Sequence, residues 1–217
     1  MTSIEINSKD KYRLETSAWL AENINLIEEK KPFSALHWMP SRERENQHHL
    51  DCQQRQKKLY DAGYAGVTVP TEYGGYGGEP WMQRIFREEA AGYQVHTGFF
   101  NSIISMTLPA LLKHGTEEQK KTHIPSLISG EVSWCQLFSE PGAGSDLAGL
   151  ATRAELDGEE FVIHGQKVWN SAAIYADMGI LLVRTNPDAY KHEGITFLLF
   201  DMKQKGVEVR PLIQAHG

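Results

Sequence analysis

Apolar positions in the first part of the chain recur at the spacing of an amphipathic helix. The stretch Lys11–Glu29 contains neither glycine nor proline, and Leu20, Ile24 and Ile27 follow at i, i+4 and i+7, which places them on one helix face. Pro32 then interrupts the pattern, because proline removes a helical hydrogen bond. We therefore expect a first helix over Lys11–Glu29.

Further helices are indicated by periodicity and by signals at their ends. Gly63 is a natural left-handed stop, and Thr116 followed by Gln119 is a capping-box signature. Pro125 suits the first turn of another helix. The expected helices are Arg42–Ala62, Trp81–Val95, Asn101–His114, Glu117–Thr122, and a short one from Pro125 to near Gly130.

The turn-rich connector from Gly63 to Pro80 separates two of these helices. Its run Gly74-Gly75-Tyr76-Gly77-Gly78 could suggest a phosphate-binding loop, but the trailing Gly-Lys-Ser/Thr and the GxGxxG pattern are both missing. A plain loop is therefore the favoured interpretation.

After Gly130 the periodicity changes to short β-branched and aromatic runs. The pair Asp157-Gly158 is a strong hairpin signal. We expect an α+β protein, with an all-α N-terminal domain (residues 1–132) followed by an antiparallel β-barrel or sandwich domain (residues 133–217). The expected strands are Ser133–Ser139, one including Phe161–Ile163, Ile180–Arg184, Ile195–Phe200 and Val207–Leu212.

Composition and charge narrow the function classes. The chain has 41% hydrophobic and 23% charged residues and a net charge of −6, so it has ordinary globular composition and no general character of a nucleic-acid binder. The two cysteines form no CxxC pair, and the scattered histidines show no metal-ligand spacing. No targeting signal or apolar run of membrane-spanning length is visible. We expect a cytoplasmic protein without a metal site.

The segment Ser139–Asp146, with sequence Ser-Glu-Pro-Gly-Ala-Gly-Ser-Asp, follows an expected strand. Such a loop can present backbone N–H groups and a hydroxyl to an electron-rich ligand edge, although composition alone favours an ordinary Pro-Gly turn. The block resembles the signature of the acyl-CoA dehydrogenase family. Further matching blocks follow the family order: Glu72-Tyr73-Gly74-Gly75, Gly115–Lys120, Gly165–Ser171 and Gly194–Phe197.

The resemblance implies an FAD site and assigns roles to residues. The Ser139 hydroxyl would meet the flavin pyrimidine edge, Ser145 would also contact the acyl-CoA pantetheine arm, and Ser171 would lie near flavin N5. Trp169 would pack on the flavin, although a buried sheet tryptophan is the usual alternative. Asn170 and the bulky pair Leu137-Phe138 depart from the common family pattern. The implied cofactor-binding set is Gln136, Phe138, Ser139, Gly144, Ser145, Trp169, Asn170 and Ser171.

The implied activity is α,β-dehydrogenation of an acyl-CoA thioester, with an electron-transfer flavoprotein or similar acceptor. The family takes its catalytic carboxylate from a further helical domain, so we expect that group beyond Gly217. The resemblance also implies that the antiparallel β domain of residues 133–217 is incomplete at its C-terminal end. When complete, the protein is expected to be a homodimer, homotetramer or heterotetramer. Truncation of a longer chain is favoured over a natural short subunit or a degenerate member. Two alternatives stay open, a flavin-dependent monooxygenase on the same fold and a non-catalytic subunit of a heteromeric dehydrogenase.

Overall fold

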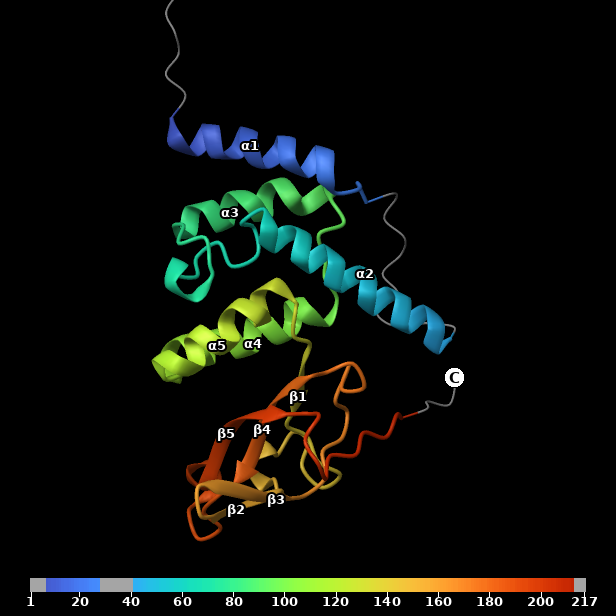
Figure 1. The fold of residues 1–217 in the computed structure, drawn as a ribbon, viewed down its shortest axis with the longest axis vertical. Coiled ribbons are helices and arrows are strands. Elements are labelled where there is room, and N and C mark those ends of the chain that lie inside the picture. The colour runs from blue at the N-terminus through green and yellow to red at the C-terminus, as the bar shows by residue number, and fades with distance from the viewer. Residues whose placement is uncertain (1–6, 28–40, 213–217) are drawn as a thin grey trace, which may run out of the picture. The chain divides into compact units, whose positions relative to one another are not determined.

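The computed structural model describes residues 7–27 and 41–212, which form two compact units (Figure 1). Of these residues, one unit comprises 7–27, 41–104 and 108–131 and is helical; the other comprises 132–212 together with Ser105–Thr107 and contains a β-sheet. The expected order of a helical region followed by a β region is confirmed. Pro32 and the chain end at Gly217 lie outside the described residues.

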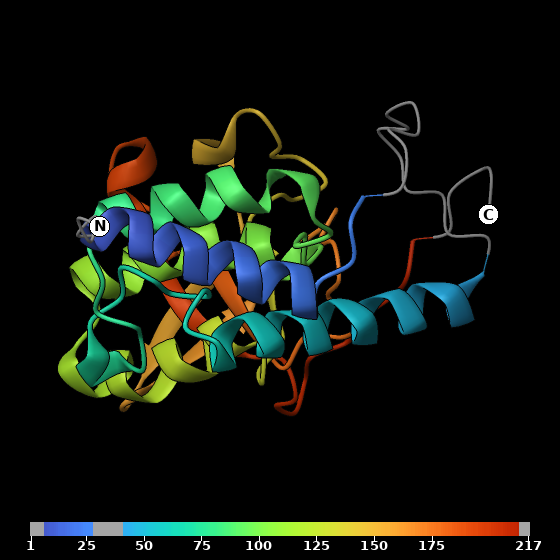
Figure 2. The ribbon, with the colours of Figure 1, turned by 90° about the horizontal axis from the view of Figure 1, so that it is seen from above.

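The helical unit contains five α-helices and two 3₁₀ turns among its described residues. Their bounds are α1 Ser8–Asn23, α2 Arg42–Asp61, η1 Thr71–Tyr73, α3 Pro80–Glu89, η2 Ala90–Gly92, α4 Phe99–His114 and α5 Glu117–Ser129. Helices α1 and α3 run side by side, as Figures 1 and 2 both show. They enclose a core of Leu20, Ile24, Leu59, Phe86 and Ala90.

Helix α1 ends at Asn23, six residues before the expected end. Ile24 is extended, and the next residues exchange backbone hydrogen bonds with the segment after η2: Ile27 N–H donates to Gly92 O (2.9 Å), and Gln94 N–H donates to Asn25 O (2.9 Å). Periodicity could not reveal this, because the competing partners lie far along the chain. Lys58 also donates to the Asn23 carbonyl at the end of α1 (2.7 Å).

The expected break before Pro125 is wrong, because α5 continues through this proline to Ser129. The missing N–H removes one helical hydrogen bond. Ile124, Leu127 and Ile128 are fully buried around it, and this apolar contact offsets the loss. The capping box of Thr116 and Gln119 is confirmed, with Thr116 Oγ1 accepting from the Gln119 amide and Gln119 Oε1 accepting from the Thr116 amide.

The glycine-rich connector joins α2 to α3 and packs tightly on itself. A Cβ at Gly75 would lie 2.1 Å from the Val69 carbonyl oxygen, so no other residue fits there. The η1 turn contacts α5 through Tyr73, whose hydroxyl donates to Glu117 (2.9 Å). The connector is therefore a structural loop within the helical unit.

Among its described residues the sheet unit contains five strands, with bounds β1 Trp134–Leu137, β2 Arg153–Asp157, β3 Glu160–His164, β4 Met178–Arg184 and β5 Ile195–Asp201. Their order is β1-β4-β2-β3, and β5 pairs with the other side of β4. The β2–β3 hairpin forms at the expected turn, where Gly158 has φ +64°. The core contains Cys135, Leu137, Ala154, Leu181 and Val183 among others.

The sheet is mixed and is not closed into a barrel among the described residues, which corrects the expectation of an antiparallel sheet. Strand β1 runs parallel to β4, and β2 meets β4 in parallel at Arg153 and Arg184. Long connections between these strands permit parallel pairing, which strand patterns alone do not reveal. The expected strand Val207–Leu212 is also wrong. Val207 packs on the core, but this segment pairs with no strand in the described part of the chain.

Candidate flavin-binding site

The motif loop begins where β1 ends and turns back on itself at once. Glu140 N–H donates to Ala143 O (2.8 Å) and Ala143 N–H donates to Glu140 O (3.1 Å). Pro141 and Gly142 form the exposed turn between them, whereas Ala143 is buried. The fixed φ of proline and the freedom of glycine suit this turn. The exposed residues Gly144, Ser145 and Asp146 follow directly.

The Glu140 carboxylate closes the base of the loop. It accepts hydrogen bonds from the backbone amides of Ala151 (2.6 Å) and Thr152 (2.9 Å) and from Lys167 Nζ (2.7 Å). Both side chains of the Glu140–Lys167 pair are only 7% exposed. A buried pair tolerates loss of water only when further hydrogen bonds satisfy it, and these amides meet that requirement.

Lys167 also connects its own segment to the start of the motif loop, although the two lie almost 30 positions apart in the sequence. Its ammonium donates to the Phe138 carbonyl (3.0 Å), and the next residue, Val168, donates its N–H to the Ser139 carbonyl (2.8 Å). The segment Lys167–Ser171 therefore lies beside the start of the motif loop. These contacts bring the predicted flavin contacts Ser139 and Trp169 into one region.

Trp169 has an unusual environment for a tryptophan. Its side chain is 72% exposed, and its backbone has φ +61°, in the left-handed region that costs a non-glycine residue about 1–2 kcal/mol. The alternative of a buried sheet tryptophan is therefore wrong. Hydrogen bonds from Ser171 N–H to Trp169 O and from Ala173 N–H to Asn170 O hold the following turn. Strain together with exposure is typical of functional positions.

The remaining predicted cofactor-binding residues differ in burial and in hydrogen bonding. Gln136 and Phe138 are half-buried, and Gln136 pairs with Ile180 in the β1–β4 ladder. Among the described residues, no protein group hydrogen-bonds the hydroxyls of Ser139, Ser145 or Ser171. Within the described part of the chain, no hydrogen bond directly connects the Gly144–Ser145 tip to Lys167–Ser171, whereas Phe138, Ser139 and Glu140 are hydrogen-bonded to that segment.

Sequence reasoning gave no role to Glu140 or Lys167, although both stand inside the matched blocks. A glutamate immediately before a Pro-Gly turn and a lysine two positions before the tryptophan were the available signals. The burial and pairing of Glu140 and Lys167 depend on tertiary structure, so these signals alone could not predict them.

The pKa values of the pair reflect burial opposed by hydrogen bonding. Burial raises the pKa of Glu140, but the hydrogen bonds from Lys167 and the loop amides outweigh it and lower this pKa to about 2. Burial lowers the pKa of Lys167, and its partner Glu140 opposes that shift. At neutral pH the pair is ionised.

Acid should therefore destabilise the sheet unit in a defined window. Because the folded pKa of Glu140 is about 2 against an ordinary 4.5, its contribution is fully present above about pH 5 and is lost as pH falls toward 2. The loss is about 3 kcal/mol at most. Urea unfolding at several pH values measures it. The Glu140→Gln variant should lack this part of the pH dependence, and an unchanged profile in that variant would contradict the assignment.

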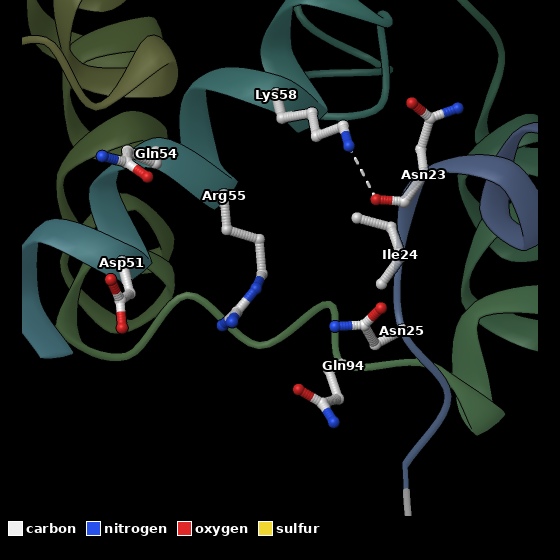
Figure 3. A pocket seen from close by; sticks show the side chains of 8 residues that line it. All are labelled: Asn23, Ile24, Asn25, Asp51, Gln54, Arg55, Lys58 and Gln94. Atoms are coloured by element: carbon white, nitrogen blue, oxygen red, sulfur yellow. Dashed lines mark hydrogen bonds between the residues drawn. The ribbon is translucent and has the colours of Figure 1, made fainter.

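A separate cavity of about 360 Å³ lies in the helical unit, lined by polar side chains that include Arg55 and Lys58 (Figure 3). Its cations already have partners: Arg55 donates to the His96 carbonyl (2.6 Å) and Lys58 to the Asn23 carbonyl. Both therefore satisfy backbone acceptors, and this cavity is not the candidate site. Within the described residues no cluster suited to a metal ion occurs, and no helix is long and apolar enough to cross a membrane.

Two family models and several known proteins are similar to this chain. A family model described as "Acyl-CoA dehydrogenase, N-terminal domain" matches residues 22–131, and one described as "Acyl-CoA dehydrogenase, middle domain" matches residues 135–217. Acyl-CoA dehydrogenase FadE34 of Mycobacterium tuberculosis is 44% identical over 169 residues, covering 77% of this chain and 23% of that protein. Acyl-CoA dehydrogenase IpdE1 of the same organism is 34% identical over 208 residues, covering 96% and 53%.

Solved structures also match this chain over most of its length. The ChsE4-ChsE5 complex from Mycobacterium tuberculosis superposes with a TM-score of 0.71 at 30% identity, covering 99% of this chain and 52% of the matched one. The Tcur3481-Tcur3483 steroid ACAD gives 0.66 at 32% identity, covering 95% and 50%. The chain thus spans about half or less of the length of these relatives. With both family models matched in order, the chain belongs to the acyl-CoA dehydrogenase family.

Proposed function

We propose that the sheet unit binds FAD and that the protein acts in the α,β-dehydrogenation of an acyl-CoA thioester. The observation that carries this proposal is the hydrogen-bonded junction of the motif loop with Lys167–Ser171, which leaves Trp169 exposed in a strained conformation. Tertiary structure maintains such strain only where the surrounding contacts enforce it. The same residues form the family signature, so geometry and sequence support one site.

The residues present fit a flavin in three respects. Trp169 offers an exposed aromatic face. The hydroxyls of Ser139, Ser145 and Ser171 have no protein partner among the described residues and can bond polar ring atoms. At Gly144 a Cβ would meet nothing within 4 Å, so folding does not require glycine there, whereas close approach of a ligand to the backbone would.

In this proposal, residues of the chain position the cofactor and the substrate, and the cofactor carries out the redox chemistry. Bound FAD would supply the acceptor for the β-hydrogen as hydride. Ser139 and the backbone from Gln136 to Gly144 would hold the ring edge, Trp169 and Asn170 would cover it, and Ser171 would donate a hydrogen bond to the ring. Ser145 would orient the pantetheine arm of the substrate.

The base that removes the α-proton is not Glu140, although this carboxylate adjoins Ser139. Glu140 is buried, bonded to three donors, and has a pKa of about 2. A general base acts best with a pKa near the working pH. We therefore propose that a carboxylate outside these 217 residues performs this step.

The test is spectroscopic. The purified full-length protein, which includes the proposed carboxylate outside these 217 residues, should show flavin absorbance, and acyl-CoA thioesters added without oxygen should bleach it. Oxygen consumption with reduced flavin, and no bleaching by short-chain, branched or steroid-bearing thioesters, would instead support a monooxygenase and reject this proposal. An electron-transfer flavoprotein should reoxidise the bleached protein if the acceptor is the expected one.

A heteromeric assembly is favoured over a homomeric one by two of the similar structures, which carry paired names, ChsE4-ChsE5 and Tcur3481-Tcur3483. We propose that this chain also pairs with a different subunit. Native mass spectrometry of the protein purified from its source should find two kinds of subunit, and a complex containing copies of one chain would contradict this.

Replacing Gly144 by alanine should weaken flavin binding without loss of stability. The added methyl meets open space, so we expect the free energy of unfolding to change by no more than about 0.5 kcal/mol. Flavin affinity should fall about tenfold, because the methyl would occupy the space of the ligand. Titration of flavin fluorescence measures the affinity. Gly92→Ala, which also meets open space, is the matched control and should bind flavin normally.

A further inference from the structure

The side chain of Arg184 ties together two turns at one end of the sheet. It stands at the last position of β4, and its guanidinium donates to three carbonyls: Ala148 (2.7 Å), Leu150 (3.1 Å) and Lys191 (3.0 Å). The first two belong to the turn that follows Ser145 and Asp146, and the third to the η4 turn, Lys191–Gly194. Among the described residues, no carboxylate lies within ion-pair distance of it.

The geometry around this guanidinium is tight. A Cβ at Gly194 would lie 2.1 Å from Asn186 O and 3.1 Å from Arg184 Nη1. The Arg184 backbone also donates to Thr152 O (2.7 Å), next to the amides that Glu140 holds. Arginine suits this place because its planar fork directs several donors at fixed angles, which a lysine ammonium cannot reproduce.

The loop that begins at Glu140 is therefore fixed at both ends. Glu140 holds its base through Ala151 and Thr152, Ala143 pairs back onto Glu140, and Arg184 holds the far side at Ala148 and Leu150. Between these anchors the exposed tip Gly144–Asp146 carries Ser145. The anchors differ in position, since Glu140 and Lys167 lie beside Ser139 and Trp169, whereas Arg184 lies beyond Ser145.

We infer that Arg184 is a positioning residue for the acyl-CoA side of the site, acting through the Leu147–Leu150 turn on Ser145, and that it couples the η4 turn to the same loop. This inference rests on the proposed function. The two anchors then have different effects. Glu140 and Lys167 determine the affinity for flavin, whereas Arg184 determines the affinity for the acyl-CoA thioester.

The test compares Arg184→Lys with Arg153→Lys. Arg153 is the register partner of Arg184, and its side chain is 62% exposed. Within the described residues its only ion pair is with Glu155, so its replacement removes no anchor of the loop. Hydrogen exchange of the flavin-free protein is the first readout. Amides of residues 147–150 and 191–194 should exchange about tenfold faster in Arg184→Lys, whereas those of β1 should not change.

Ligand binding is the second readout. Flavin affinity of Arg184→Lys should stay within about twofold of the parent protein, while the dissociation constant of a non-reactive acyl-CoA analogue should rise about tenfold. Unchanged exchange at 147–150, unchanged analogue affinity, or an equal loss of flavin and analogue binding would each overturn the inference. A parent protein that binds no flavin would instead count against the proposed function, and the exchange experiment would still decide whether Arg184 anchors the loop.

Discussion

Replacing Glu140 with glutamine should lower the free energy of unfolding by about 3–5 kcal/mol. Glu140 accepts from the Ala151 amide at Oε2 and from the Thr152 amide and Lys167 at Oε1, and glutamine keeps only one of these two oxygens. At least one of the three donors therefore loses its acceptor, and the Lys167 ammonium is left buried beside a neutral group. Because the same lysine holds the Phe138 carbonyl, flavin affinity should fall as well. Urea unfolding and flavin titration measure the two effects.

The matched control is Glu159→Gln, which removes the same charge from an exposed position in the β2–β3 turn and should change stability by less than about 0.5 kcal/mol. The double variant Glu140→Gln with Lys167→Met should recover part of the lost stability, since no buried charge then lacks a partner. Equal stability of the Glu140 and Glu159 variants would show that the buried pair contributes nothing.

Replacing Trp169 with glycine should reduce flavin affinity by about tenfold or more while stability changes by at most about 1 kcal/mol. The side chain is exposed and therefore contributes little to the core, and glycine relieves the left-handed backbone. Flavin titration and thermal unfolding separate the effects.

Tyr190→Gly is the control for this variant, because Tyr190 is an aromatic residue of the sheet unit with a similar exposure of 70% and has no proposed role in flavin binding. Its replacement should leave flavin affinity unchanged. If Trp169→Gly bound flavin as tightly as the parent, the assigned packing of this tryptophan would be wrong.

Helix patterns and cap signals in the sequence located most helices, because these signals are local. The capping box at Thr116 and the stop at Gly63 are examples, with α2 ending at Asp61. The errors arose where distant contacts override local preference. The chain after Asn23 pairs with the segment Gly92–Gln94, and Pro125 stays within α5 because its neighbours are buried.

The signature residues indicated where the candidate site lies, but they did not predict the backbone conformation and the side-chain pairs that form it. Whether Trp169 is buried or exposed depends on a backbone conformation that no sequence pattern specifies. The pairing of Glu140 with Lys167 joins residues 27 positions apart. Parallel pairing of β1 with β4 likewise depends on the path of the connection between them. These features follow from tertiary packing.

The central claim is that this chain binds flavin through the motif loop and the Trp169 segment. Titration of the purified, flavin-free protein with FAD, followed by flavin fluorescence and by Trp169-dependent tryptophan fluorescence, tests it most directly. We expect saturable binding of one FAD per chain, with quenching of tryptophan emission that disappears in Trp169→Phe. Absence of saturable binding by the folded chain, or the same quenching in Trp169→Phe, would contradict the account.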